Sequence, residues 1–347
     1  MAPLPIERLP PTDPFRNTAI DLFGPIPIRD TVKLRVTKET WGVIFCCMTT
    51  SAIHLEVTES YSTDSFLLCL RKFFVTYPTP SYIQCDPGTQ LVAAGKAVQK
   101  WDFTKIRNFN NARSIEWHVI PTASQHYNGC VESLIKSVKK QLVDVLSPSR
   151  LTKGELDTLF AEVAYKINSR PLMIRAGSDP WSDGPITPLH LLRARTTFEV
   201  PTTTFDENAT IQKRLQFLEQ TKQQFWNKWF CQVFAKLVPS QKWHHTKRDM
   251  QVGDIVLMKN SSKLQSEYKL GRVSEVFPGK DNKVRHVTVE YKNIQPGRDI
   301  KNLPFHKTER SIHNLAVIVP VDWSPDDIEK AVTLEAKTNK LFHHTHD

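Results

Sequence analysis

The sequence predicts an α/β protein: a mixed sheet flanked by helices, followed by a long helix and a small C-terminal β-barrel. Three observations predict this fold class. Strand-like and helix-like runs alternate over residues 17–170, which favours a layered α/β architecture. Residues 208–237 carry an apolar stripe at helical spacing, which indicates one long helix. Residues 250–320 hold short strand-like runs between turn signals such as Pro278-Gly279, which is typical of a small barrel.

The first strands should form an antiparallel meander, because three runs rich in Val, Ile, Phe and Thr are separated by short spacers. These runs are Asn17–Ile28, Trp41–Thr50 and Ala52–Thr58. A helix over 64–77 follows, with Thr63 or Asp64 as its cap.

Strands and helices then alternate. We expect a strand at Tyr82–Cys85, a helix at Thr89–Trp101, a strand at Ile115–Ile120, a helix over 129–146 that Asn128 can cap, and a helix from Thr152 toward Arg170. Thr152 and Glu155 have the spacing of a capping box, which marks the start of that last helix. The barrel strands are expected at Val252–Met258, Gly271–Phe277, Val284–Tyr291 and Ile312–Val319.

These elements divide the chain into five parts. We expect an extended, Pro-rich lead-in over 1–14, an α/β domain over 15–200, a helical linker over 201–249, a basic β-barrel domain over 250–320 and a tail over 321–347. Residues 173–207 are rich in Pro, Thr and Ser and are expected to be a linker.

The charge distribution favours a polyanionic partner. The formal net charge is +10, and residues 201–320 hold 20 Lys and Arg against 11 Asp and Glu. A basic C-terminal region of this kind favours binding to DNA. No apolar run approaches the roughly 20 residues that a membrane helix needs, so no membrane partner is expected. The six cysteines include no C-x-x-C pair, which favours reduced thiols over a disulfide framework or a zinc knuckle.

Two aspartates stand at positions where a carboxylate needs an explanation. Asp21 lies inside an apolar strand, where an unpaired carboxylate is costly, so we expect it to have a metal or a cation as partner. Asp86 follows a short strand and precedes the next helix, and ligands commonly bind beyond strand ends in α/β sheets. Each aspartate also has a plain reading. Asp21 could lie at a strand edge and face water, and Asp86 could belong to an ordinary Asp-Pro-Gly turn.

A third carboxylate lies near the start of a later helix. Glu132, Lys136 and Lys139 stand at i, i+4 and i+7, so all three share one side of that helix. A solvated Glu–Lys face is the plain reading of this pattern. Taken together, however, Asp21, Asp86 and Glu132 could meet at one edge of the sheet. Clustered carboxylates repel each other, and a hard divalent cation such as Mg²⁺ relieves that repulsion.

Three sequence blocks around these acids resemble the catalytic blocks of retroviral-type integrases. They are Asp-Leu-Phe-Gly-Pro at 21–25, Cys-Asp-Pro-Gly-Thr-Gln-Leu-Val at 85–92 and Asn-Gly-Cys-Val-Glu at 128–132. The opening Met-Ala-Pro-Leu-Pro, Asn-Ser-Arg-Pro-Leu at 168–172 and Thr-Pro-Leu-His-Leu-Leu at 187–192 look more like the integrases of Bel-Pao LTR retrotransposons. The module from Val252-Gly-Asp-Ile-Val to about residue 315 resembles the domain that follows the core in those elements.

This resemblance, which covers roughly residues 1–320, implies a ribonuclease-H-like core over 15–200 with Asp21, Asp86 and Glu132 as catalytic and metal-binding triad. It implies Mg²⁺ or Mn²⁺, as two ions, and double-stranded DNA (element ends and target) as substrate. The implied reactions are 3′-end processing and strand transfer by a homo-oligomer, in the nucleus after a cytoplasmic stage. It also implies four DNA-binding residues, namely Lys136, Lys139, Asn128 and Gln125.

The chain also departs from the family. Forty-five residues separate Asp86 from Glu132 (132 − 86 − 1), and residues 101–114 look like a surface insertion. Pro87 stands where relatives often carry a polar or basic residue. The 20 residues before Asp21 hold neither Cys nor His, so the family's N-terminal zinc module is not among them. We therefore expect an element fragment, a misplaced start or a domesticated derivative.

Three functions remain open on sequence alone. The first is an integrase core, which the intact triad favours. The second is a catalytically silent DNA-binding derivative, which the missing zinc module favours. The third is a nuclease of the same fold that cuts without joining. The Asn128-Gly129 pair before the glutamate and the basic C-terminal module favour an integrase over the nuclease.

Overall fold

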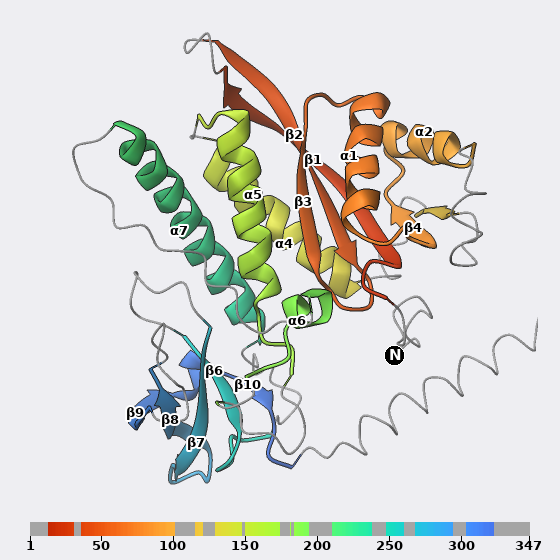
Figure 1. Ribbon diagram of the computed structural model, residues 1–347. Coiled ribbons are helices and arrows are strands. Elements are labelled where there is room, and N and C mark those ends of the chain that lie inside the picture. The colour runs from red at the N-terminus through yellow and green to blue at the C-terminus, as the bar shows by residue number, and fades with distance from the viewer. Residues whose placement is uncertain are drawn as a thin grey trace, which may run out of the picture.

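The computed structural model describes residues 13–30, 36–100, 115–120, 129–147, 150–173, 181, 184–193, 210–237, 248–259, 268–293 and 303–322 (Figure 1). These residues form two five-stranded sheets and the helices that pack on them. Within the described ranges, none of the helices combines the length and the apolarity needed to cross a bilayer.

The first sheet is mixed, as predicted. It has the order β3-β2-β1-β4-β5, built from β1 (Asn17–Arg29), β2 (Thr37–Cys47), β3 (Ile53–Thr58), β4 (Tyr82–Cys85) and β5 (Glu116–Val119). The first three strands are antiparallel neighbours, which confirms the predicted meander. β4 pairs parallel to β1, and β5 pairs parallel to β4.

Alternation along the central strands creates a core on each face of this sheet. Ile20, Phe45 and Cys47 pack with α1 (Thr63–Thr76) and α2 (Thr89–Val98) on one side. Ala19, Ile44 and Cys46 pack with α4 (Gly129–Leu146) and α5 (Lys153–Asn168) on the other. Successive side chains of a strand point to opposite faces, so neighbouring residues serve different cores. The layers are visible in Figure 1, where α1 and α5 lie on opposite sides of β3.

The N-terminal cap of α1 differs from the prediction, whereas that of α5 matches it. Ser62, rather than Thr63 or Asp64, caps α1, because its side chain accepts a hydrogen bond from the backbone N–H of Ser65 at 3.2 Å. The capping box between Thr152 and Glu155 is present in full and confirms the predicted start of α5.

The stretch expected to be a linker holds secondary structure, so that expectation was wrong in part. α6 (Pro188–Arg193) lies within it, and Met173 forms an antiparallel bridge with Ile186. The backbone N–H of Thr187 donates to Nδ1 of His190 at 3.1 Å, and the Thr187 hydroxyl lies 3.1 Å from the same nitrogen, which ties the residue before α6 to the first turn of that helix.

The predicted long helix is α7 (Thr210–Leu237). Its apolar stripe packs against α4 and α5, and Trp229 is fully buried there. The stripe therefore serves to pack α7 on the first domain.

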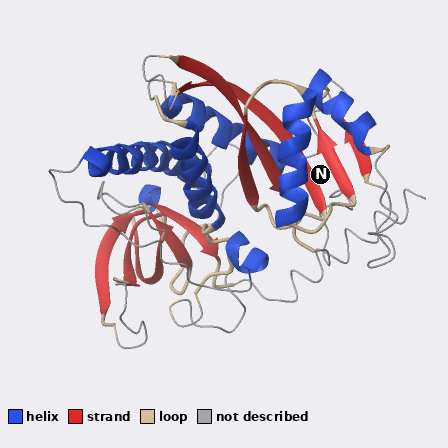
Figure 2. Ribbon diagram, turned by 45° about the horizontal axis from the view of Figure 1, so that its top comes forward, coloured by secondary structure: helices blue, strands red, loops and turns tan. Residues whose placement is uncertain are grey.

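The second sheet has the order β10-β6-β7-β8-β9 with antiparallel neighbours throughout. Its strands are β6 (Ile255–Met258), β7 (Lys269–Pro278), β8 (Val284–Lys292), β9 (Phe305–Ser311) and β10 (Leu315–Val319), with a 3-10 turn at Ile312–Asn314. Figure 2 shows it as a curved sheet beside α7. β9 was not predicted, and the expected turn at Pro296-Gly297 lies outside the described residues.

Aromatic side chains join the second sheet to the rest of the protein. Tyr268, just before β7, places its ring edge-on to Trp226 of α7, with ring centroids 4.9 Å apart. Trp181, from the first part of the chain, packs on the second sheet. The Arg272 guanidinium carbon lies 4.7 Å from the centroid of its ring, and the Phe305 ring lies edge-on to it with ring centroids 5.0 Å apart. Each part therefore inserts one aromatic anchor into the other.

Candidate active site

Asp21 and Asp86 lie side by side on neighbouring parallel strands. The register pairs Ile20 of β1 with Cys85 of β4. The residue that follows each of them is one of the two aspartates, Asp21 and Asp86. Burial raises the pKa of Asp21 above its ordinary value, and the nearby charge of Asp86 raises it further, while Lys139 lowers it. The two carboxylates are therefore close enough to repel each other electrically.

A lysine from α4 partners Asp21. The Lys139 ammonium donates a hydrogen bond to Asp21 Oδ2 at 2.6 Å, and the two side chains are 28% and 19% exposed. The sequence predicted a metal or a cation for this carboxylate, and the structure supplies a cation. Ile135 and Val138 fix the direction of the lysine, because they bury the adjacent side of α4 against the sheet.

Glu132 lies in the first turn of α4 and is half-buried. It precedes Lys139 by two helical turns, which is about 10 Å along the axis. Lys136 is exposed between them. Among the residues that the structure describes, no three His, Cys, Asp or Glu side chains are grouped so that they could hold a metal ion. Asn128 and Gln125 lie outside the described residues.

The strand end that carries Asp86 is fixed by a contact that sequence reasoning missed. The Trp117 indole N–H donates to the Cys85 sulfur at 3.2 Å. The same ring covers Gly95 of α2, where an added Cβ would lie 2.6 Å from a ring carbon. Burial raises the pKa of the Cys85 thiol to about 11, so it stays neutral and is not a nucleophile at neutral pH. A glycine inside a helical pattern was the available signal for this close approach.

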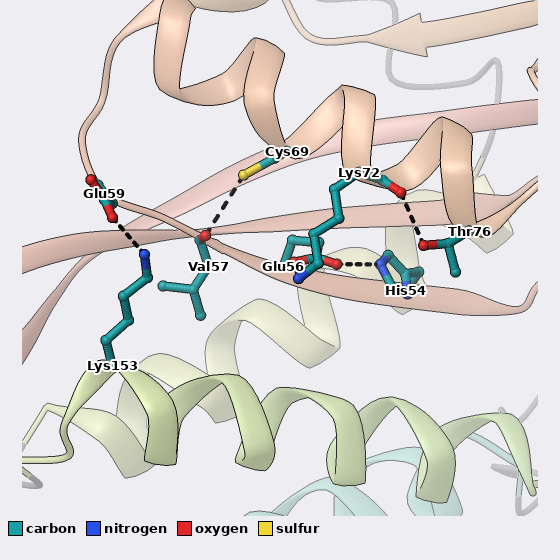
Figure 3. Close-up of polar contacts among 8 residues, drawn as sticks. All are labelled: His54, Glu56, Val57, Glu59, Cys69, Lys72, Thr76 and Lys153. Carbon is teal, nitrogen blue, oxygen red and sulfur yellow. Dashed lines mark hydrogen bonds and ion pairs between the residues drawn. The ribbon is translucent and has the colours of Figure 1, made fainter.

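A second polar cluster lies between β3 and α1 (Figure 3). The Glu56 carboxylate pairs with His54 Nε2 at 2.8 Å and with the Lys72 ammonium at 2.6 Å. Burial alone would raise the pKa of Glu56, but the hydrogen bonds from His54 and Lys72 outweigh it and lower that pKa. Both carboxylate oxygens of Glu56 are occupied by these contacts, so the cluster serves to hold α1 on the sheet.

The aspartate of the Val252-Gly-Asp-Ile-Val block has a structural role. Asp254 is fully buried, and Arg248 donates to both of its oxygens at 2.9 Å. The backbone N–H groups of Gln251 and Val321 add two further hydrogen bonds at 2.9 Å. Burial would raise the pKa of Asp254, but these partners lower it. Asp254 thus ties the segments that enter and leave the second sheet.

The thiols agree with the predicted absence of disulfides over the part of the chain that the structure describes. Cys46, Cys47, Cys69 and Cys85 are free and buried, whereas Cys231 is free and exposed.

Comparison with known proteins gives a family match and resemblances to solved structures. Residues 213–306 match the model of a family of unknown function, DUF5641. The matched segment begins within α7 and ends within β9. No curated protein matches the chain.

The structural resemblances are to integrase assemblies. A chain of the cryo-electron-microscopy structure of the simian T-cell lymphotropic virus intasome in complex with PP2A regulatory subunit B56 gamma is 10% identical, with 92% of this chain and 85% of that chain covered and a TM-score of 0.35. The catalytic core domain of BIV integrase is 13% identical, with 51% and 93% covered and a TM-score of 0.31.

Proposed function

We propose that this chain carries the catalytic core of a retroelement integrase of the Bel-Pao type, a polynucleotidyl transferase that processes and joins DNA ends. One observation carries the proposal. Two of the three family-like blocks end up on adjacent strands with Asp21 beside Asp86, and the helix of the third block reaches the same point through Lys139. The closeness of Asp21, Asp86 and the helix that carries Glu132 supports the proposal.

The strand directions support a ribonuclease-H-like core as part of this proposal. Three antiparallel strands lead into two strands parallel to the first, in the order β3-β2-β1-β4-β5. We further propose that the second sheet is the basic β-barrel domain expected over 250–320, and that the core spans 15–200 and the helical linker 201–249.

The donor set at the candidate site suits a hard divalent cation. Asp21 and Asp86 offer carboxylate oxygens, which are the ligands that Mg²⁺ and Mn²⁺ prefer. The half-buried carboxylate of Asp21 already pairs with one cation, the ammonium of Lys139. We propose that Asp21, Asp86 and Glu132 bind Mg²⁺ or Mn²⁺, as two ions. A metal ion held by these carboxylates would activate the attacking oxygen and stabilise the leaving oxygen in phosphodiester exchange.

The remaining residues of the site would serve DNA. Lys136 is exposed one turn before Lys139 and can meet a phosphate of the element's end. We propose that Asn128 and Gln125 shape the mouth of the pocket, and that the second sheet holds DNA largely through phosphate contacts. A homo-oligomer acting in the nucleus completes the proposal.

The test is an end-processing assay with a DNA duplex that ends in the element's own sequence and with Mn²⁺ as the metal. Glu132→Gln should abolish cleavage while its DNA affinity stays within about twofold, because the change removes a metal ligand and leaves the basic residues in place. Lys140→Gln, an exposed change on the same helix, is the control. Cleavage that survives in Glu132→Gln would refute the triad. DNA binding without cleavage in the unsubstituted chain would favour the catalytically silent derivative.

A further inference from the structure

Lys139 makes a contact that the family resemblance does not imply. The resemblance assigns this lysine to the DNA end, and the structure places its ammonium on Asp21 Oδ2 at 2.6 Å. Lys139 is 28% exposed, so it is neither a free surface lysine nor a core residue. Of the two DNA-contact lysines that the resemblance implies on α4, only Lys136 faces outward within the described helix.

The surroundings explain why the lysine turns toward the carboxylate. Asp21 is 19% exposed and lies next to a second carboxylate, Asp86, on the neighbouring strand. A half-buried carboxylate with a like charge beside it is costly to leave unpaired. The ammonium of Lys139 supplies the missing positive charge, since its helix is held at that distance by buried residues on the adjacent side.

We infer that Lys139 is the counter-ion of Asp21, and that a divalent cation must displace it from that carboxylate before it can bind. This inference rests on the proposed function, because it concerns the same site. A metal ion and an ammonium cannot share one carboxylate oxygen without strong repulsion. Metal binding therefore frees the lysine, and the freed ammonium, beside Lys136, becomes available to a DNA phosphate.

The exchange has a measurable consequence for the metal alone. A metal ion that displaces an ammonium loses the free energy of that ion pair. Removing the positive charge should therefore tighten metal binding. For a half-buried pair we expect roughly a five- to tenfold gain in Mn²⁺ affinity, somewhat above the range for fully exposed pairs. The DNA affinity should move the other way, because one phosphate contact is lost.

The experiment measures free Mn²⁺ by electron paramagnetic resonance, with the full chain and without DNA. Lys139→Met and Lys139→Gln are compared with the unsubstituted chain, and circular dichroism melts establish that each variant is folded. Lys140→Met is the matched control, because it removes the same charge from an exposed position of the same helix. Lys139→Arg keeps the charge and should leave the Mn²⁺ affinity near that of the unsubstituted chain.

Tighter Mn²⁺ binding in both neutral variants, with Lys140→Met unchanged, is the expected result. Unchanged or weaker binding in the neutral variants would overturn the inference, weaker binding meaning that Lys139 holds Asp21 in place for the metal. Asp86→Asn distinguishes a failure of the proposed metal site from a failure of the proposed exchange with Lys139. If Asp86→Asn does not weaken Mn²⁺ binding, the proposed metal site itself is wrong. If it does, a failure of the lysine variants counts against the exchange alone.

Discussion

Tyr268 offers the sharpest test of how the second sheet is joined to the core. Its ring packs on the aromatic face of α7, edge-on to Trp226 at 4.9 Å and also against Trp229 and Phe230. Its hydroxyl oxygen is buried and has no hydrogen-bond partner among the described residues. The ring should therefore stabilise the joint, and the hydroxyl should weaken it.

Two substitutions separate these contributions. Tyr268→Ala removes the aromatic packing and should cost about 3 kcal/mol, the lower end for a large buried aromatic because this residue is only partly buried. Tyr268→Phe keeps the ring and removes a desolvated, unpaired hydroxyl, so it should be neutral or stabilise by up to about 1 kcal/mol.

The assay is differential scanning calorimetry of the full chain. At about 2–4 °C per kcal/mol, Tyr268→Ala should lower the Tm by roughly 6–12 °C, while Tyr268→Phe should leave it unchanged or raise it slightly. A Tm that is the same in Tyr268→Ala would mean that the ring does not hold the two parts together. A clear loss of stability in Tyr268→Phe would mean that the hydroxyl has a favourable partner, contrary to the contacts described above.

Three further predictions concern two buried polar contacts and the binding of DNA. The Asn168 amide exchanges two hydrogen bonds of 2.8 Å with the backbone of Ile53, so Asn168→Ala should lower the free energy of unfolding by about 2–3 kcal/mol in urea denaturation; a loss below about 0.5 kcal/mol would contradict this. The pKa of Glu56 is lowered in the folded state, so its contribution to stability is present above the ordinary carboxyl pKa and is lost as the pH falls through the lower, folded value. Glu56→Gln should flatten this acid side of a Tm–pH curve, and an unchanged curve would mean that the cluster is not coupled to folding. DNA affinity of the full chain should fall steeply and linearly on a log–log plot against salt, and a salt-independent affinity would rule out phosphate-dominated binding.

Much of the fold was predictable because strands buried on both faces have near-continuous apolar sequences. Neighbouring residues of β1 and β2 serve opposite cores, so both neighbours are apolar and the strands stand out as apolar runs between short spacers. A partner for Asp21 was also predictable in kind, since burial of an unpaired carboxylate is costly. Which residue would supply the charge was not predictable, because Lys139 lies 118 positions away and only the packing of α4 brings it there.

Other features had no local signal. β9 has the sequence FHKTERS and is mostly exposed at the edge of its sheet, so the apolar alternation that marks a strand is missing. The anchors Trp181 and Tyr268 depend on contacts across long stretches of chain. The cap of α1 was missed by one residue, because Ser62 and Thr63 are both good N-cap residues and only the backbone geometry separates them.

The most direct test of the central claim is strand transfer from a pre-processed DNA end into a plasmid, with Mg²⁺ or Mn²⁺. The full chain is compared with Glu132→Gln and with Asp86→Asn, and Asp64→Asn, an exposed acid on α1, serves as control. Joined product in the unsubstituted chain and in Asp64→Asn, lost in the other two variants, is the predicted result. Joined product that persists in Glu132→Gln or Asp86→Asn would contradict the assignment of these carboxylates as the catalytic site.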